Sequence, residues 1–278
     1  MKSGFATLLG RPNVGKSTLL NQILGTKVSI VSDKPQTTRH QIRGILNGDG
    51  VQVVFVDTPG IHKPSTVLGQ RLNDTAAAAV ADVDVVVLVI DATAPLGKGD
   101  RWVAARVPRS ALCVVNKVDI ASPATIAVQL AAAGALGLSE YFPVSARTGD
   151  GVDELVAAIV ARMPDGPQLY PGDVVSDVPE AMWVAELVRE QLLAVARDEL
   201  PHSIACRVSE WDWPHITVEI FVERESQKGI VIGRGGEVLK EVGTRAREQL
   251  PAGVYLELVV KVDKDWQRRP AALQRLGY

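Results

Sequence analysis

Short apolar runs alternate with stretches of helical period over roughly the first 165 residues. Several runs consist of Val, Ile and Leu without polar alternation, which is typical of parallel strands covered on both faces. The predicted strands are Phe5–Leu9, Val51–Val56, Val83–Ile90, Ala111–Val115 and Tyr141–Val144. The predicted helices are Lys16–Leu24, Leu68–Val80, Lys98–Val107, Pro123–Leu136 and Val152–Met163. This alternation predicts an α/β domain with a mostly parallel, doubly wound sheet over residues 1–165.

The pattern changes after residues 166–181, a segment rich in proline and glycine that we interpret as a linker. Beyond it the predicted order is helix, strand, strand, helix, helix, strand. The predicted elements are helices at Met182–Arg197, Ser226–Val231 and Glu237–Gln249, and strands at Ser203–Glu210, His215–Glu223 and Val254–Val262. Residues 182–278 are therefore expected to form a second, smaller α+β domain.

The amino-acid composition excludes several classes of protein. The chain has 278 residues, of which 46% are hydrophobic and 22% charged, which excludes a disordered or collagen-like protein. Its two cysteines lie in separate apolar segments, so a disulfide scaffold is excluded and a reducing cytoplasm is expected. No apolar run approaches the ~20 residues that a membrane span needs.

Charge is nearly balanced over the chain but unevenly distributed. The net charge is −2, which does not indicate a nucleic-acid binder. However, Arg224–Arg247 contains six basic and three acidic residues, and Lys261–Tyr278 contains five basic and two acidic residues. Such clusters can form a basic face on an acidic protein or only a solvated helix surface.

A phosphate-binding motif lies between the first predicted strand and the first predicted helix. The sequence GRPNVGKS fits G-x-x-x-x-G-K-[ST], and strand and helix flank it as the motif requires. Its backbone N–H groups would cradle phosphates, Lys16 would reach the β- and γ-phosphates, and Ser17 would bind Mg²⁺. The predicted nucleotide-binding residues here are Gly10, Arg11, Pro12, Asn13, Val14, Gly15, Lys16, Ser17 and Thr18. A chance glycine-rich turn before a helix is the alternative.

A second element follows the strand Val51–Val56. Asp57-Thr58-Pro59-Gly60 places a carboxylate where it can hold Mg²⁺ through water, and the Gly60 N–H where it can contact a γ-phosphate. We add Ile61, the next residue, to the predicted nucleotide-binding set.

A third element indicates which base is bound. Asn116-Lys117-Val118-Asp119 ends the strand Ala111–Val115, and Ser145-Ala146-Arg147 follows the last predicted strand. A carboxylate such as Asp119 can accept both N1–H and N2–H₂ of guanine, whereas adenine offers no such donor pair. A backbone N–H of the Ser145–Arg147 segment would bond the guanine O6.

These motifs together resemble the translation-factor-related family of P-loop GTPases. The resemblance implies Mg²⁺-dependent GTP hydrolysis and two switch segments, roughly Thr26–Gly44 and Gly60–Thr75. The first switch would supply a threonine to the Mg²⁺ when GTP is bound. Thr37 and Thr38 are adjacent, and we favour Thr38, with Ser17 and Asp57 as the other Mg²⁺ residues.

The sequence differs from Ras-like GTPases at one position that matters for hydrolysis. Ras-like enzymes carry a water-orienting glutamine where this chain has Ile61, and an alkyl side chain cannot orient water. Similar GTPases with this substitution often use K⁺, and an asparagine at the position of Asn13 is their signature. We therefore expect K⁺ stimulation with Asn13 as a ligand; a loop-stabilising amide is the alternative. The expected catalytic residues are Lys16, Asn13, Thr38 and Gly60.

A second glycine-rich turn lies in the smaller domain. Gly233-Arg234-Gly235-Gly236 between two helical patterns forms a G-x-x-G turn that a nucleic-acid backbone can approach. The order of elements around it resembles a type II KH domain, which binds about four single-stranded nucleotides. A KH fold retained only for packing is the alternative. The predicted RNA-binding residues are Lys228, Ile232, Gly233, Arg234, Gly235, Gly236, Lys240 and Trp266.

A GTPase domain followed by a type II KH domain resembles the Era family of bacterial GTPases nearly end to end. The resemblance implies GTP and GDP as ligands, binding near the 3′ end of small-subunit (16S) ribosomal RNA, and a switch role in assembly of the 30S subunit. It also implies peripheral association with the inner face of the cell membrane, although no basic amphipathic helix is evident. We expect a monomer.

Two other functions stay open at this point. One is a GTPase that supports tRNA modification or carries tandem GTPase domains, which a single nucleotide site and an intact G-x-x-G turn disfavour. The other is an RNA-binding scaffold that holds GTP without hydrolysing it. Comparing GTP turnover in K⁺ and in Na⁺ would test the scaffold hypothesis.

Overall fold

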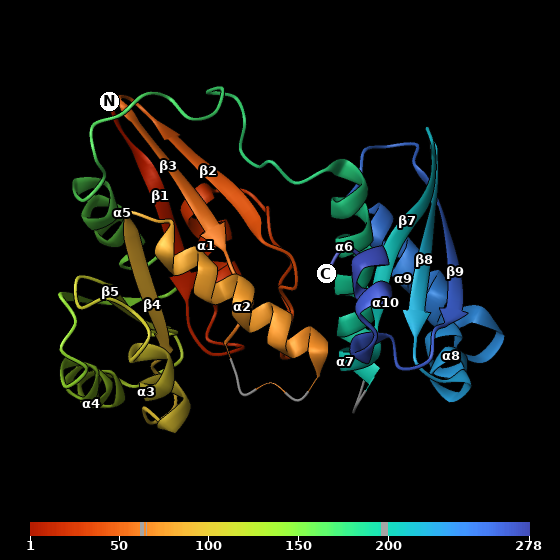
Figure 1. The fold of residues 1–278 in the computed structure, drawn as a ribbon, viewed down its shortest axis with the longest axis horizontal. Coiled ribbons are helices and arrows are strands. Elements are labelled where there is room, and N and C mark those ends of the chain that lie inside the picture. Colours follow the sequence, from red (N-terminus) through yellow and green to blue (C-terminus); the bar gives the residue numbers. More distant parts are fainter. Residues whose placement is uncertain (62–63, 65, 196–199) are drawn as a thin grey trace. The chain divides into compact units, whose positions relative to one another are not determined.

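The computed structural model of the chain describes residues 1–61, 64, 66–195 and 200–278 (Figure 1). Two compact units are distinguished. The first covers most of residues 1–177, and the second contains Val178–Tyr278 together with Ser32–Thr37 and residues 66–68. Among the described residues, no helix is long and apolar enough to span a membrane.

The first unit is built on a six-stranded sheet with the order β2-β3-β1-β4-β5-β6. Its strands are β1 (Lys2–Leu9), β2 (Ile42–Gly48), β3 (Val51–Asp57), β4 (Val85–Asp91), β5 (Leu112–Asn116) and β6 (Glu140–Val144). All neighbouring pairs are parallel except β2 with β3, which are antiparallel, so the predicted mostly parallel, doubly wound sheet is confirmed. The edge strand β2 was not predicted.

Helices cover both faces of this sheet. They are α1 (Lys16–Leu24), α2 (Val67–Ala81), α3 (Lys98–Ala104), α4 (Pro123–Gly134) and α5 (Val152–Ala161). Successive residues of β4 point to opposite faces: Val87 packs in one core with α1 and α5, whereas Leu88 packs in the other with α2, α3 and α4. Each fully buried Val or Leu contributes about 1.5–3 kcal/mol of burial free energy, which holds the sheet rigid beneath its loops.

Local signals set the ends of α1. It begins directly after Gly15, whose φ of 97° only glycine adopts readily, and ends at Gly25, which has a φ of 64°. The Gly25 N–H donates to the carbonyl of Gln22 at 3.3 Å. The first helical residue after the phosphate-binding turn is therefore Lys16.

The second unit combines helices with a three-stranded sheet of order β7-β8-β9. Its elements are α6 (Glu180–Val195), α7 (Leu200–Ser203), β7 (Ala205–Asp212), β8 (His215–Val222), α8 (Glu225–Ile232), η1 (Arg234–Gly236), α9 (Glu237–Arg247), β9 (Tyr255–Val262), η2 (Trp266–Arg268) and α10 (Pro270–Arg275). The sheet pairs β7 antiparallel and β9 parallel to β8. Residues 196–197 of the predicted first helix lie outside the described residues.

Candidate functional site

The predicted nucleotide residues gather at one edge of the first sheet. Because β3, β1, β4, β5 and β6 run parallel, their carboxyl ends lie side by side, and open α/β sheets bind ligands at that edge. Asp57, Asp91 and Asn116 are the last residues of β3, β4 and β5. The phosphate-binding turn follows β1, and Ser145 follows β6.

Gly15 and Gly60 lie so close to neighbouring atoms that a side chain at either position would clash. A Cβ on Gly15 would lie 2.3 Å from Nδ2 of Asn116, and one on Gly60 would lie 2.9 Å from the backbone nitrogen of Pro12. Both distances are shorter than real Cβ contacts. The Asp57–Gly60 segment therefore packs directly against the phosphate-binding turn.

Lys16 is buried within this turn. Its ammonium donates to the carbonyl oxygens of Gly10 at 3.2 Å and Arg11 at 3.0 Å. Burial lowers the pKa of Lys16 to about 8, although the nearby Asp57 carboxylate opposes the shift. A cation held this way gains a stronger partner when a phosphate enters the turn.

Four oxygen-bearing side chains converge beside Lys16. Oδ2 of Asp57 accepts hydrogen bonds from Ser29 Oγ at 2.8 Å, Ser17 Oγ at 3.0 Å and Thr38 Oγ1 at 3.4 Å. The hydroxyls of Ser17 and Thr38 lie 2.9 Å apart. The Thr37 hydroxyl instead donates to the Lys34 carbonyl at 2.7 Å, so Thr38 is the threonine that the structure brings to Asp57.

The chemistry of this cluster fits Mg²⁺. Oδ1 of Asp57 is buried and has no hydrogen-bond partner among the residues that the structure describes. Burial raises the pKa of Asp57, although the hydrogen bonds from Ser29, Ser17 and Thr38 and the charge of Lys16 act against it. Hard oxygen donors around an under-coordinated carboxylate are what Mg²⁺ binds, so Ser17, Thr38 and Asp57 can hold it.

The base-recognition residues are tied together by hydrogen bonds. Asn116 is buried; its Nδ2 donates to the Val14 carbonyl at 2.8 Å, and its Oδ1 accepts from the Ala146 N–H at 2.9 Å. The Ser145 hydroxyl donates to Oδ1 of Asp119 at 2.9 Å. The Asp119 carboxylate is thus oriented but exposed, as recognition of a guanine edge requires.

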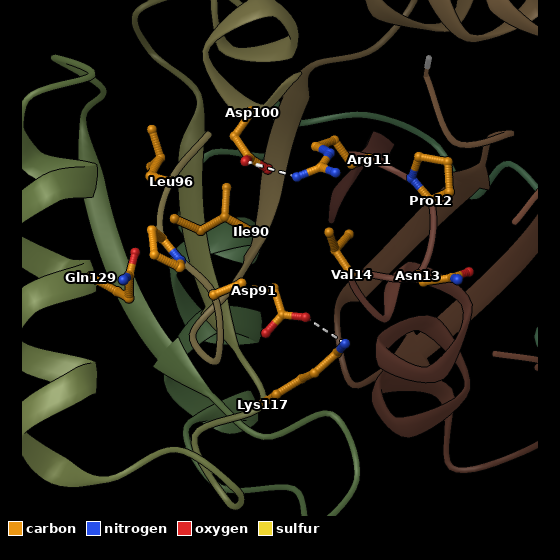
Figure 2. Close-up of a pocket in the computed structure, with 12 residues that line it drawn as sticks. Arg11, Pro12, Asn13, Val14, Ile90, Asp91, Leu96, Asp100, Lys117 and Gln129 are labelled. Carbon is orange, nitrogen blue, oxygen red and sulfur yellow. Dashed lines mark hydrogen bonds and ion pairs between the residues drawn. The ribbon is translucent and has the colours of Figure 1, made fainter. Parts of the chain in front are cut away.

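A pocket of about 200 Å³ lies beside the phosphate-binding turn (Figure 2). Two ion pairs lie in its wall: Lys117 Nζ to Asp91 Oδ2 at 2.5 Å and Arg11 Nη1 to Asp100 Oδ2 at 3.2 Å. Asn13, which has a φ of 64°, also lines this pocket and is exposed. A separate hollow of about 500 Å³ is lined in part by Thr18, Ala146 and Arg147.

The remaining predicted nucleotide residues lie around the turn without facing these hollows. The Thr58 hydroxyl donates to the Leu8 carbonyl at 3.1 Å, and the Val118 N–H donates to the Val144 carbonyl at 3.3 Å. Ile61 is buried in the core, and its N–H donates to the Gly10 carbonyl at 3.3 Å. Its side chain therefore points away from any position that could orient water. Pro59 is buried beside it.

Sequence reasoning missed two residues of this site. Ser29 is buried and bonds Asp57, but nothing in its sequence neighbourhood marks it. Asp91 ends an apolar strand, as Asp57 and Asn116 do, and that shared position was the available signal. Hydrogen bonds from Lys117 and Thr93 lower the pKa of Asp91, although burial acts in the opposite direction.

The G-x-x-G turn of the second unit is open to its surroundings. Gly235 and Gly236 have φ of 62° and 82°, and an added Cβ on either would meet no atom within 4 Å. Gly233, with a φ of 75°, approaches Val238 closely, at 2.5 Å from an added Cβ to Cγ2. Arg234 and Lys240 are exposed, whereas Lys228 and Ile232 are half-buried. The turn therefore combines accessible backbone with positive charge at the start of α9.

Trp266 corrects one expectation. Its side chain is fully buried, its indole N–H donates to the Ser203 carbonyl at 2.9 Å, and its ring stacks on Tyr278 with centroids 5.8 Å apart. The side chain is part of the packing of the second unit, so the prediction that it stacks on RNA is wrong. Basic neighbours in the sequence suggested a surface position, but η2 turns the ring inward.

Comparisons with known proteins agree with this site and fold. Residues 5–117 match the family model described as a 50S ribosome-binding GTPase, and residues 199–267 match the KH domain model. GTPase Era from a Nocardioides species is 46% identical over all of this chain and 96% of its own length. GTPase Era from Mycobacterium tuberculosis is 47% identical over 99% of this chain and 98% of its own length.

The chain belongs to the Era family of GTPases. Two solved Era structures resemble it in fold, each with a TM-score of 0.94 and each covering 100% of this chain and 99% of its own. One, 40% identical, is an Aquifex aeolicus Era variant bound to GDP and AlF₄⁻. The other, 39% identical, is Era in complex with MgGDPNP and nucleotides 1506–1542 of 16S ribosomal RNA. This Era-family chain is therefore a GTPase with a KH domain.

Proposed function

We propose that this Era-family GTPase binds the 3′ end region of small-subunit (16S) ribosomal RNA through its KH domain and acts as a GTP-controlled switch in 30S subunit assembly. The observation that carries this proposal is the intact G-x-x-G turn, whose Gly235 and Gly236 leave the backbone accessible. Support also comes from the solved Era complex with nucleotides 1506–1542 of 16S ribosomal RNA.

We assign the phosphates of GTP to the turn Gly10–Ser17 and the guanine to Asp119. Lys16 would exchange its bonds to Gly10 and Arg11 for bonds to the β- and γ-phosphates. The Gly60 N–H would contact the γ-phosphate. Loss of the γ-phosphate on hydrolysis would therefore release the Asp57–Gly60 segment. Mg²⁺ held by Ser17, Thr38 and Asp57 would offset phosphate charge in the transition state.

The residue directly after Gly60 cannot orient the attacking water, because Ile61 has an alkyl side chain that is buried in the core. We propose that K⁺ bound near Asn13 supplies the missing positive charge. The exposed amide of Asn13 at the rim of the turn supports this assignment. Turnover should then be faster in K⁺ than in Na⁺ at equal ionic strength, and Asn13→Ala should remove the difference without preventing GTP binding.

We expect the protein to act in the cytoplasm as a monomer, and we do not assign the peripheral membrane association that the family resemblance implies. GTP would order residues 26–44 and thereby favour the conformation that binds RNA, which is a population shift between two states.

The proposal is tested by equilibrium binding to an oligonucleotide that copies the 3′ end of small-subunit ribosomal RNA. The double variant R234D/G235D adds negative charge to the open turn, and aspartate tolerates the left-handed φ of Gly235. We expect its RNA affinity to fall at least about tenfold at matched salt, since it reverses charge beside phosphates. Arg101→Asp in the first unit reverses the charge of another exposed arginine and should bind RNA normally.

Binding that is equal for the oligonucleotide and a scrambled control would contradict the proposal. Retained binding in R234D/G235D would show that RNA does not contact the G-x-x-G turn. In both cases the GTPase activity would stand. In the first case its client would be another molecule, and in the second case the RNA would bind another surface of the protein.

A further inference from the structure

The hydroxyl of Ser29 lies in the oxygen cluster of the first unit, although we assign it no contact with Mg²⁺. Ser29 is fully buried, and its Oγ donates to Oδ2 of Asp57 at 2.8 Å. Of the three hydroxyl contacts described for that oxygen this is the shortest, since Ser17 lies at 3.0 Å and Thr38 at 3.4 Å. Ser29 therefore contacts the carboxylate more closely than either serine or threonine assigned to the metal.

The two oxygens of the Asp57 carboxylate have different surroundings. Oδ2 accepts the bonds from all three hydroxyls, whereas Oδ1 is buried and has no hydrogen-bond partner among the described residues. An aspartate carboxylate turns easily about its last side-chain bond, because that torsion has broad minima. A hydrogen bond that holds Oδ2 therefore also decides where Oδ1 points.

The backbone of Ser29 is itself anchored by a side chain of α1. Nδ2 of Asn21 donates to the Ser29 carbonyl at 2.8 Å, and Oδ1 of Asn21 accepts from the N–H groups of Val28 and Ser29, both at 3.0 Å. The flanking residues Val28 and Ile30 are buried. Asn21, Ser29 and Asp57 all belong to the first unit. The helix that follows the phosphate-binding turn thus sets the position from which the Ser29 hydroxyl reaches Asp57.

The partner of this hydroxyl indicates a role beyond packing. An alanine can occupy a fully buried position without any hydrogen-bond partner, whereas a buried serine hydroxyl needs one. Here the partner is the carboxylate of the Mg²⁺ site instead of a backbone carbonyl nearby. Hydrogen-bond partners of metal-binding carboxylates orient them and raise metal affinity.

We propose that Ser29 is a positioning residue for Mg²⁺ binding and therefore for GTP hydrolysis. It holds Oδ2 of Asp57, so that Oδ1 stays directed for the metal or its bound water. Ser29 acts only through Asp57 and contacts neither the nucleotide nor the metal. This inference rests on the proposed function, since it takes Asp57 as the Mg²⁺ carboxylate.

Four variants test the inference. Ser29→Ala removes the hydroxyl, and Ser29→Cys keeps a side chain of similar shape whose thiol is only a weak donor. Ser3→Ala is the matched control: Ser3 is buried in the same unit, and its hydroxyl donates to the Pro167 carbonyl at 2.7 Å near the start of β1, away from the turn. Asp57→Asn neutralises the carboxylate itself and serves as the reference for a lost metal ligand.

The measurements are the affinity for a non-hydrolysable GTP analogue in EDTA, its dependence on Mg²⁺ concentration, and thermal unfolding. In Ser29→Ala, the Mg²⁺ concentration that half-saturates the protein–analogue complex should rise about tenfold, the range for a lost partner of a metal-binding carboxylate. Analogue affinity in EDTA should change less than about twofold, because Ser29 does not touch the nucleotide. Ser29→Cys should resemble Ser29→Ala. Ser3→Ala should show wild-type Mg²⁺ dependence, with a loss of thermal stability similar to that of Ser29→Ala.

A folded Ser29→Ala protein with wild-type Mg²⁺ dependence would overturn the inference, as long as Asp57→Asn has lost that dependence. An equal fall of analogue affinity in EDTA and in Mg²⁺ would indicate a structural role alone and would also overturn it. If Ser29→Ala does not fold, the Mg²⁺ dependence of Ser29→Cys decides. Wild-type Mg²⁺ dependence in Asp57→Asn would instead contradict the Mg²⁺ assignment in the proposed function, so the two failures are distinguishable.

Discussion

Two glycine-rich turns begin helices in this molecule, and their surroundings differ. The turn before α1 is enclosed: a Cβ on Gly15 would strike Asn116, and Lys16 is buried with a pKa lowered to about 8. The turn before α9 is open, with space around Gly235 and Gly236 and exposed cations beside them. An enclosed turn suits one small ligand in one pose, whereas an open turn suits a long, variable backbone.

The largest effect should come from removing the buried cation of the enclosed turn. Lys16→Ala takes away the donor expected on the β- and γ-phosphates, and the rate of single-turnover GTP hydrolysis should fall at least about a hundredfold. Nucleotide-free oligonucleotide binding should stay at the wild-type value, because that contact is assigned to the open turn. A variant that hydrolyses GTP normally would show that Lys16 has no role in catalysis.

A pair of glycine substitutions compares the two turns directly. Gly15→Ala places a Cβ 2.3 Å from Asn116 at a φ of 97°, so GTP affinity should fall at least about tenfold. Gly235→Ala at a φ of 62° meets no atom within 4 Å, so it carries only the left-handed strain of about 1–2 kcal/mol. Its oligonucleotide affinity should fall only a few-fold. Both affinities would be measured by titration. An equal fold loss of GTP affinity in Gly15→Ala and of oligonucleotide affinity in Gly235→Ala would remove the contrast between the turns.

The pH dependence of nucleotide binding sharpens the same contrast. The pKa of Lys16 is about 8 before binding, and a bound phosphate would raise it. Binding therefore takes up a proton above pH 8, and GDP affinity should fall as pH rises, by about tenfold between pH 7 and pH 9. Calorimetry in two buffers of different ionisation heat would detect this proton uptake at pH 9. A flat profile with no proton uptake would contradict the buried environment of Lys16.

The smallest effect on RNA binding is expected at Trp266. Trp266→Phe removes the hydrogen bond to the buried Ser203 carbonyl, which should cost about 1–2 kcal/mol in the free energy of unfolding. Oligonucleotide affinity should change less than about twofold, because the ring is buried. A loss of RNA affinity without a loss of stability would restore the stacking role that the structure argues against.

The sequence predicts features that are set by neighbouring residues better than features that depend on distant parts of the chain. The helix Lys16–Leu24 was predicted to the residue, because glycine turns fix both ends. The strand β2 was missed, because Gly44, Asn47 and Gly48 have weak strand preference and pairing with β3 supplies what they lack.

Side-chain contacts show the same difference between local and non-local features. Motif spacing placed Asp57 and Asn116 correctly at strand ends, but the contact from Ser29 to Asp57 joins residues 28 positions apart. No local pattern encodes such a contact. The direction of Trp266 likewise depends on Ser203, 63 residues earlier, and could not be read from its basic neighbours.

The measurement that tests the switch most directly is RNA affinity in two nucleotide states. The oligonucleotide copying the 3′ end of small-subunit ribosomal RNA would be titrated against protein loaded with a GTP analogue or with GDP, at one salt concentration. We predict at least about fivefold tighter binding in the GTP-analogue state. Linkage then requires the RNA to improve GTP-analogue affinity relative to GDP affinity by the same factor. Equal RNA affinity in both states would contradict the coupling of the two turns.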